Sequence, residues 1–405
     1  MSPVEYIICQ TNHLNQFKDR LGARISRPRL SFTGTLGRYL RTRGLNGLFQ
    51  LFSGSGSIID VTPYVERNLK RREIRLANLF GNRLVKATYR TLVGIQARLM
   101  CHEIAALLDR NPQATALIFN GFLMPGSLLA GLATARNQNR LYLEKGFFPN
   151  TIQCDRKGIN CASSLSRDPA FYRWVAPMVG AARPDMLVRR RSKRPDDTAL
   201  SSLPERFIFV PFQVPSDMQI LAHSPFVRDM EHFYEIVFEA AEALPDRVFV
   251  VKEHPSFALS IRNRVRPHPR ILFANSNETR ELIESSAGVL TINSTVGLEA
   301  LTLGRKVVTL GDAPYNVEGL VQMAASVSEV IDRVSALDTF TPDEALRDTF
   351  IGYVFNEFLL HGDMMEPGEA LESQIRSRAE GRDRHSRLLS EFQIHKADSE
   401  HVPNA

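Results

Sequence analysis

The chain has 405 residues, of which 43% are hydrophobic, and its formal net charge is +6. At roughly 100–200 residues per domain, this length predicts two domains, with a core large enough to need no disulfide or structural metal. The four cysteines form no CxxC pair and the ten histidines no HxH or HExxH spacing, which argues against a zinc site and favours reduced thiols in a cytoplasmic protein. No apolar run approaches the ~20 residues of a membrane span, and no signal-peptide pattern is evident, so we expect a soluble or peripheral protein.

Positive charge is concentrated near the N-terminus. Between Lys18 and Arg98 stand 17 Lys and Arg residues against four acidic residues, a local charge of +13, which leaves −7 on the remainder of the chain. Such asymmetry indicates an anionic partner, such as a membrane surface, a nucleic acid or an acidic glycan. A solvated basic surface without a partner is the alternative. No aromatic-plus-basic pattern of a known RNA module is present, so we expect no nucleic-acid partner.

The first half begins with a short predicted strand at 5–11. The glycine-rich stretch 31–57 ends in SGSGS, which lacks the third glycine of a dinucleotide fingerprint and is therefore expected to be a loop. Apolar periodicity then predicts helices at 64–80, 89–111 and 125–137, and strands at 114–121 and 140–146. Residues 147–169 are expected to be loop-rich.

The second half alternates more regularly between strands and helices. Predicted strands occupy 206–213, 247–255, 270–275, 287–293 and 306–311, and predicted helices occupy 226–244, 277–286 and 294–304. Nearly continuous apolar strands between helices indicate a parallel sheet that is covered on both faces. The sequence therefore predicts two α/β halves, each Rossmann-like, with a cleft between them.

The expected domain boundaries follow from a charged, proline-bearing stretch at 182–204, which is typical of a linker. Residues 1–190 are predicted to form an N-terminal α/β domain that includes the basic region. Residues 205–375 are predicted to form the C-terminal nucleotide-binding domain, and 376–405 a charged tail with a loosely held helix and a disordered end.

Three polar segments follow predicted strands of the second half, where ligands of open parallel sheets bind. They are FQVPSDMQ at 212–219, KEHP at 252–255 and NSTVG at 293–297. In the last, Asn293 or Ser294 can cap the following helix, and the hydroxyls of Ser294 and Thr295 with the free backbone N–H groups can form an anion site. A plain helix cap without a ligand is the alternative. Gly297 is expected to keep the first turn open.

The other two segments carry ionisable groups. His254 can donate a hydrogen bond to a phosphate, or to a neighbouring carbonyl, and Pro255 fixes the turn. Lys252 lies two residues earlier and is expected on the same side of the strand, whereas Glu253 should face the other side and receives no function. After the first strand come Gln213 and Asp217. The aspartate can serve as a base, a nucleophile or a ligand for sugar hydroxyls, or it can close an Asx-turn.

In the first half, "FNG" (Asn120, Gly121) and "EKG" (Glu144, Lys145) also follow apolar strands and are expected to face the cleft. Glu144 can act as a general acid or base. Asp155, in Asp155-x-x-Gly158, is more typical of a turn.

Taken together, the segments FNG, LEKGFFPNTIQCDRKGIN, PFQVPSDMQI, VKEHPSF and INSTVGLEALTLGRKVVTLG resemble the bacterial capsule polysaccharide β-Kdo transferases. The resemblance spans residues 110–320 and is strongest to the single-module enzymes that start the glycolipid anchor of exported capsules. It implies a GT-B-like fold with the nucleotide on the C-terminal domain and the acceptor on the N-terminal one. It also implies a CMP-β-Kdo donor, retention of configuration, and no cofactor or obligatory metal.

The resemblance implies specific roles for the residues above. His254 and Pro255 would hold the CMP moiety together with Ser294 and Thr295, and Gln213 would lie in the same donor site. Asp217 would be the nucleophile and Glu144 the acid/base. Retention requires two inversions and therefore a covalent glycosyl-enzyme. Lys252 or Lys145 would face the carboxylate of Kdo.

For the partners, the resemblance implies a phosphatidylglycerol-type lipid acceptor, and the basic region would then hold the enzyme at the inner face of the cytoplasmic membrane. Three alternatives stay open. The chain can be a CMP-sugar-dependent Kdo transferase acting on a glycan terminus, a non-catalytic capsule assembly or export protein, or a GT-B-type nucleotide-sugar epimerase that needs no acceptor.

Overall fold

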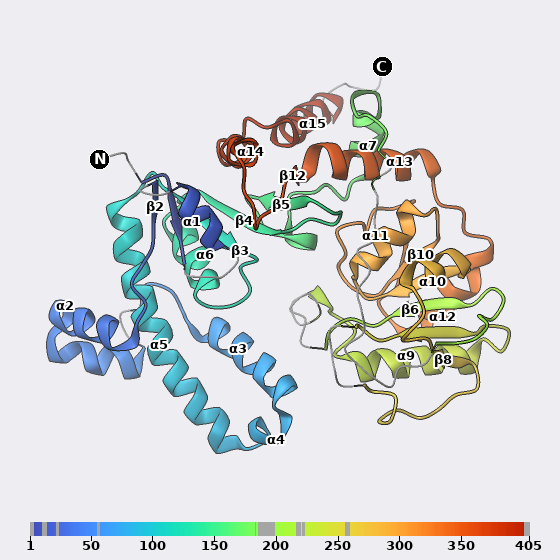
Figure 1. Cartoon of the computed structure of the whole chain (residues 1–405), viewed down its shortest axis with the longest axis horizontal. Helices are drawn as coiled ribbons and strands as arrows, with labels where there is room; N and C mark the ends of the chain where they lie inside the picture. Colours follow the sequence, from blue (N-terminus) through green and yellow to red (C-terminus); the bar gives the residue numbers. More distant parts are fainter. Residues whose placement is uncertain are drawn as a thin grey trace. The chain divides into compact units, whose positions relative to one another are not determined.

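The computed structural model describes residues 4–9, 14–21, 24–54, 57–182, 184, 199–215, 220, 223–255 and 260–400. The chain forms two compact units (Figure 1). Unit 1 consists of Met1–Gly146, Asn150–Ser164 and Leu360–Ser386, and unit 2 of Phe147–Pro149, Leu165–Leu359 and Arg387–Ala405. Each unit carries a six-stranded sheet. The prediction of a GT-B-like α/β fold with two Rossmann-like domains is confirmed, while the cleft between them stays a prediction.

Unit 1 is built on a sheet of strand order β12-β5-β4-β3-β1-β2. Strands β1 to β4 are parallel to their neighbours, and β5 and β12 add an antiparallel edge. The strands are β1 Tyr6–Ile8, β2 Ile25–Ser26, β3 Thr115–Phe119, β4 Arg140–Lys145, β5 Thr151–Asp155 and β12 Leu360–His361. The helices are α1 Asn15–Leu21, α2 Phe32–Ser53, α3 Thr62–Arg75, α4 Ala77–Phe80, α5 Arg83–Arg110, α6 Gly126–Ala135 and α14 Glu369–Ala379. A short 3-10 turn, Asn160–Ala162, follows β5.

Unit 2 is built on a fully parallel sheet of order β11-β10-β9-β6-β7-β8. Numbered within the unit this is 3-2-1-4-5-6, the doubly wound Rossmann order. The strands are β6 Ile208–Pro211, β7 Phe249–Lys252, β8 Ile271–Phe273, β9 Gly288–Thr291, β10 Val307–Thr309 and β11 Gln322–Met323. The helices are α7 Pro169–Val175, α9 Met230–Ala243, α10 Thr279–Ser285, α11 Thr295–Thr302, α12 Val327–Ser335 and α13 Glu344–Tyr353, the last continued by a π-helical turn at Val354–Phe358.

The nearly continuous apolar strands of unit 2 are explained by burial on both faces of the sheet. Phe207 and Phe209 belong to the hydrophobic core on one face, and Ile208 and Val210 to the core on the other. Because side chains alternate along a strand, a strand covered on both sides must be apolar at every position.

Two elements of unit 1 lie in stretches for which the sequence predicts no helix or strand. The stretch 31–57 contains α2, which bends at Gly44, where φ is 61°. Its glycines lower helix propensity, but burial of Tyr39 and Leu51 against Leu99 of α5 stabilises the helix. The expected loop 147–169 contains β5, whose burial follows from antiparallel pairing with β4.

The structure also divides the chain differently from the predicted boundaries at 190, 205 and 376. The chain already enters unit 2 at Leu165 and returns to unit 1 at Leu360, because β12 pairs with β5 and α14 packs on the same sheet. Of the expected linker 182–204, residues 183 and 185–198 lie outside the described residues. The helix predicted in the charged tail is present as α15 Arg384–Glu400. It is not loosely held, because Leu388 and Phe392 are buried in the unit 2 core. Residues 401–405 are not described.

One helix in the described part of the chain, α5, is long and apolar enough to cross a membrane by length and composition alone. Half of its most apolar window is buried inside the protein. Ala97, Ile104 and Leu108 of α5 belong to the core of unit 1. This is the pattern of a core helix.

Candidate functional site

The carboxyl edge of the unit 2 sheet carries the described residues of the three predicted polar segments, which are 212–215, 252–255 and 293–297. Strand β6 lies between β7 and β9, at the point where the strand order reverses. In doubly wound sheets, ligands bind outside the strand ends at this switch point. The backbone N–H of Phe212 donates to the carbonyl of Lys252 at 2.8 Å, so the ends of β6 and β7 stay side by side.

Gln213 and Asn293 join the ends of β6 and β9 across the switch point. Gln213 Nε2 donates to Asn293 Oδ1 at 3.0 Å, and the Asn293 backbone N–H donates to Gln213 Oε1 at 3.3 Å. Asn293 Nδ2 donates to the carbonyl of His223 at 3.3 Å. Both side chains are buried. Gln213 therefore holds the segment that leads into α11 in place, a contact that its predicted role in donor binding did not anticipate.

Ser294 is the N-cap of α11, and its Oγ accepts a hydrogen bond from the Val296 N–H at 3.2 Å. Thr295 is exposed at the first position of the helix. The Tyr315 hydroxyl donates to the carbonyl of Ser294 at 2.5 Å. A Cβ on Gly297 would lie 2.1 Å from that hydroxyl, so this glycine makes room for Tyr315. We had expected it to keep the helix turn open.

At the end of β7, Lys252 and Glu253 are tied to the chain that follows β8. Lys252 Nζ donates to the carbonyl of Asn275 at 2.7 Å and to that of Asn277. These contacts make Lys252 a brace between two strand ends, and its predicted role beside the Kdo carboxylate stays a prediction.

Glu253, which sequence reasoning left without a function, is buried at 5% exposure. Its carboxylate accepts hydrogen bonds from Ser260 Oγ at 2.7 Å, from the Ile261 N–H at 2.8 Å and from Asn275 Nδ2 at 2.8 Å. Its own backbone N–H donates to Asn275 Oδ1 at 2.9 Å. Glu253 thus joins the end of β7 to Ser260, Ile261 and Asn275. The available sequence signal was an acidic residue directly after an apolar strand and before His254-Pro255. Its hydrogen-bond partners lie too far along the sequence to be predicted from this signal.

Two of the predicted donor-site residues, His254 and Pro255, follow Glu253 directly and are partly buried. Residues 256–259, which come next, lie outside the described residues. The predicted nucleophile Asp217 also lies outside them, within the gap 216–219. Its role stays a prediction, and the described chain on either side ends at Pro215 and resumes at Ile220.

In unit 1, Asn120 and Glu144 lie at the carboxyl ends of the neighbouring parallel strands β3 and β4. The Asn120 N–H donates to the Leu143 carbonyl at 2.9 Å, and Asn120 has a φ of 45°. Gly121 has a φ of 77°, and a Cβ there would lie 2.8 Å from the Tyr142 ring, so only glycine fits. Glu144 is partly buried and Lys145 is exposed. The structure brings the three predicted polar residues, Asn120, Glu144 and Lys145, to one edge of unit 1.

Asp155 forms the expected turn, because its Oδ1 accepts from the N–H groups of Lys157 at 2.7 Å and Gly158 at 3.2 Å. Its second oxygen accepts from Ser164 Oγ, which lies 2.8 Å from His385 Nε2. Burial lowers the pKa of His385 well below its usual value, helped by the positive charge of Arg378. Here the serine lies between the acid and the histidine. A hydrolytic triad instead has the histidine in the middle, so the buried cluster is structural.

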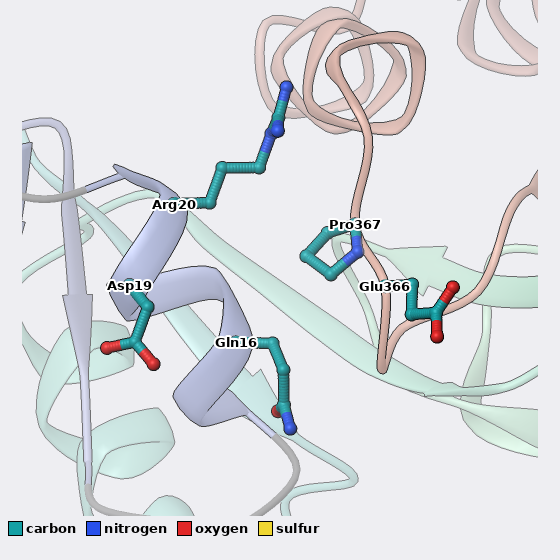
Figure 2. A pocket seen from close by; sticks show the side chains of 5 residues that line it. All are labelled: Gln16, Asp19, Arg20, Glu366 and Pro367. Atoms are coloured by element: carbon teal, nitrogen blue, oxygen red, sulfur yellow. The ribbon is translucent and has the colours of Figure 1, made fainter.

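A separate pocket of about 550 Å³ lies in unit 1 between α1 and the segment before α14. Figure 2 shows Gln16, Asp19 and Arg20 on one side and Glu366 and Pro367 on the other. None of the predicted site residues lines it. Among the residues that the structure describes, no cluster of three His, Cys, Asp or Glu side chains is arranged to hold a metal ion.

The protein has two Rossmann-like units with polar residues at the strand ends. This architecture places it in the general class of two-domain α/β proteins, which also includes the GT-B glycosyltransferases. Residues 185–364 match the family model described as "Capsule polysaccharide biosynthesis protein". The chain is 43% identical over 313 residues to "Protein FixF" of Sinorhizobium fredii, covering 76% of each protein. It is 24% identical over 284 residues to "Capsule polysaccharide export protein KpsS" of Escherichia coli, covering 55% of this chain and 72% of that protein.

A solved structure of Thermosulfurimonas dismutans KpsC, described as a beta Kdo 2,4 transferase, is also similar. It has a TM-score of 0.43 and 17% identity, and the match covers 65% of this chain and 86% of that chain. The chain belongs to the same family as FixF, and the match of residues 185–364 agrees with the resemblance of its motifs to capsule polysaccharide proteins.

Proposed function

We propose that this protein is a retaining glycosyltransferase that moves β-Kdo from CMP-β-Kdo to a phosphatidylglycerol-type lipid during capsule biosynthesis. The observation that supports it best is the switch point of unit 2. There the buried Gln213–Asn293 pair precedes the capped start of α11, and β7 ends at the same edge in Lys252, Glu253, His254 and Pro255. A rigid, polar strand edge of this kind suits a nucleotide phosphate.

The CMP moiety would bind at this edge. His254 would donate a hydrogen bond to the phosphate, and the helix N-terminus at Ser294 and Thr295 would stabilise the negative charge that develops as CMP leaves. This stabilisation comes from protein groups alone, so the proposal includes no cofactor or metal. Glu253 would keep His254 in place through its hydrogen bonds to Ser260 and Ile261.

The chemistry would proceed in two displacements. A carboxylate oxygen of Asp217 attacks the anomeric carbon of Kdo while the bond to the phosphate oxygen breaks, which gives CMP and a glycosyl ester. Glu144 then takes the proton of the acceptor hydroxyl, whose oxygen attacks the same carbon as the ester bond to Asp217 breaks. Two inversions retain the configuration.

The acceptor and the location are parts of the same proposal. A phosphatidylglycerol-type lipid would present its hydroxyl at the bilayer surface, and the basic segment between Lys18 and Arg98 would attract an anionic membrane. The enzyme would then be cytoplasmic and peripheral at the inner face of the cytoplasmic membrane.

The test is incubation with CMP-Kdo, generated in situ, and a fluorescent phosphatidylglycerol. Wild type is expected to transfer Kdo, and Asp217→Asn to lose at least about a thousandfold in rate. Glu144→Gln is expected to accumulate a Kdo adduct on the protein, visible by intact mass. Asp246→Asn, at an exposed loop aspartate of unit 2, is the matched control and should behave as wild type.

Each alternative outcome contradicts a different part of the proposal. Transfer to a soluble glycan but not to the lipid would contradict the acceptor. Full activity of Asp217→Asn would contradict the nucleophile, and a changed sugar without any acceptor would indicate an epimerase.

A further inference from the structure

Exposed apolar side chains gather on the helices of the N-terminal region. Among the described residues, the large hydrophobic side chains that are exposed within 32–92 are Phe32, Leu48, Phe49, Phe52, Ile58, Leu76, Leu79, Leu84 and Leu92. Across the rest of the described chain they are Met178, Met323, Met365 and Ile394. Single exposed apolar residues are ordinary, but a concentration in one region marks an interaction surface.

The turn between α3 and α5 carries three of these side chains. Helix α4 forms this turn and lies at the end of α5 that is remote from the sheet of unit 1 (Figure 1). Leu76, Leu79 and Leu84 are exposed there, Leu84 at 74%. We call residues 71–86 the leucine turn.

The leucine turn is well folded despite its exposed leucines. Phe80 is buried and lies edge-on to Tyr89 at 5.3 Å between ring centroids. Asn82 caps α5 through its side chain. Phe80 therefore supplies the buried apolar side chain of this turn, and folding of the turn does not require the exposed leucines.

The leucine turn is also strongly basic. It contains Arg71, Arg72, Arg75, Arg83 and Lys86, and its one acid, Glu73, pairs with Lys86 at 2.7 Å. Arg72, Arg75 and Arg83 are exposed. The leucine turn thus carries three exposed arginines and three exposed leucines within 13 residues of sequence, so it combines apolar and cationic groups.

Helix α2 repeats this combination. Leu48, Phe49 and Phe52 are exposed, Phe49 at 73%, and their spacing puts Leu48 and Phe52 on one face of the helix, with Phe49 beside them. Arg41 and Arg43 of the same helix are exposed as well.

We propose that the leucine turn docks on a lipid bilayer that contains anionic lipids, with α2 as a second contact. The leucines enter the boundary between headgroups and acyl chains, and the arginines contact lipid phosphates, which is the arrangement of interfacial helices. This inference deepens the proposed function and rests on it, because the proposed lipid acceptor is the reason for the protein to bind a bilayer. The docking itself is measurable without donor or transfer.

A protein partner fits these observations less well. A stable protein interface buries roughly 1,200 Å² or more, far more than three leucine side chains expose, and it requires a complementary surface. A fluid bilayer adapts to any small apolar projection, and its anionic headgroups complement the arginines.

The test is flotation of the full chain with vesicles of phosphatidylglycerol and phosphatidylcholine in equal parts, and with vesicles of phosphatidylcholine alone. Wild type is expected to bind the first at least about tenfold more tightly, with a strong salt dependence. Leu79→Asp/Leu84→Asp should weaken binding at least about tenfold. Arg75→Gln/Arg83→Gln should weaken it on the order of tenfold and reduce the salt dependence. Ile394→Asp, at a residue of α15 that is 63% exposed, is the control and should bind as wild type.

Wild-type binding by the Leu79→Asp/Leu84→Asp variant, with an unchanged unfolding midpoint, would overturn the proposal. So would light scattering that shows this variant to lose a dimer while its vesicle binding is unchanged, because the leucines would then pair two copies. Kdo transfer to a short-chain phosphatidylglycerol dissolved as monomers distinguishes failure of the proposed function from failure of the docking proposal. The leucine variant should transfer Kdo to it as wild type does. No transfer by wild type in any form would contradict the function and leave the docking intact.

Discussion

The strand ends of the two units carry similar polar residues but hold them differently. In unit 2, Gln213, Asn293, Glu253 and Asn275 are buried and hydrogen-bonded between strand ends that are distant in sequence. In unit 1, Glu144 is partly buried and Lys145 is exposed. A buried network fixes its members in one geometry, because any displacement leaves polar groups unsatisfied. The strand ends of unit 2 are therefore held in one geometry by a buried network, whereas Glu144 and Lys145 at the strand end of unit 1 are more exposed.

The largest expected effect tests the rigidity of unit 2. Glu253→Ala should lower the free energy of unfolding by about 3 kcal/mol or more, because the donors of Ser260, Ile261 and Asn275 lose a charged acceptor. It should also weaken CMP binding. Urea unfolding and calorimetric CMP titration measure the two effects.

Glu239→Ala, at an exposed position of α9, is the control for Glu253→Ala and should change stability by no more than about 0.5 kcal/mol. A Glu253→Ala protein as stable as this control would show that the network carries no stability.

A smaller effect is expected at the helix that follows β9. Gly297→Ala should cost about 2 kcal/mol, because its Cβ would displace the Tyr315 hydroxyl from the Ser294 carbonyl. In Tyr315→Phe the hydroxyl is absent, so adding Gly297→Ala to that variant should cost less. Thermal unfolding of the two single variants and the double variant measures the coupling, and strict additivity would contradict this explanation.

A pH effect on stability is expected from a buried polar cluster in unit 1. It would show that the contrast between a buried network in unit 2 and exposed groups in unit 1 applies only to the strand ends. His385 is neutral in the fold because burial lowers its pKa, whereas the unfolded chain takes up a proton near pH 6.5. Below that pH the unfolded state binds more protons, so stability should fall with falling pH, by up to about 1.4 kcal/mol per pH unit.

The comparison of wild type with His385→Asn between pH 7 and 5 isolates this effect. His102, whose pKa burial also lowers, is common to both proteins and cancels. Parallel stability curves would contradict the assignment to His385, which is packed against Asp155, Ser164 and Arg378.

The smallest effects compare one strand end in each unit. Gln213→Ala should cost about 1–2 kcal/mol, because Asn293 Oδ1 and the Asn293 backbone N–H lose their hydrogen bonds to Gln213. Asn120→Gly should cost about 0.5 kcal/mol, because glycine tolerates the φ of 45°. Chemical unfolding measures both, and equal costs would remove the contrast between the units.

The sequence predicted strands β6 to β10 of unit 2 well, because strands buried on both faces are apolar without interruption, as from Phe207 to Val210. It made no prediction for β11, α12 and α13. It missed β5 because that strand ends in polar residues and depends on its partner β4. It predicted a helix in the C-terminal segment but not that Leu388 and Phe392 of this helix are buried in the core of unit 2. The roles of Glu253 and Gln213 as braces depend on residues 7 to 80 positions away, which no local pattern reveals.

The pairing of β12 with β5 joins residues about 208 positions apart, Leu360 with Ile152. Arg378, from the same returning segment, is buried and donates to the carbonyl of Cys154. During synthesis, the sheet of unit 1 therefore cannot be completed until nearly the whole of unit 2 has left the ribosome. Until then the edge of β5 is open to other strands. Unit 2 is completed later still, because Leu388 and Phe392 of α15 belong to its core and follow the returning segment of unit 1.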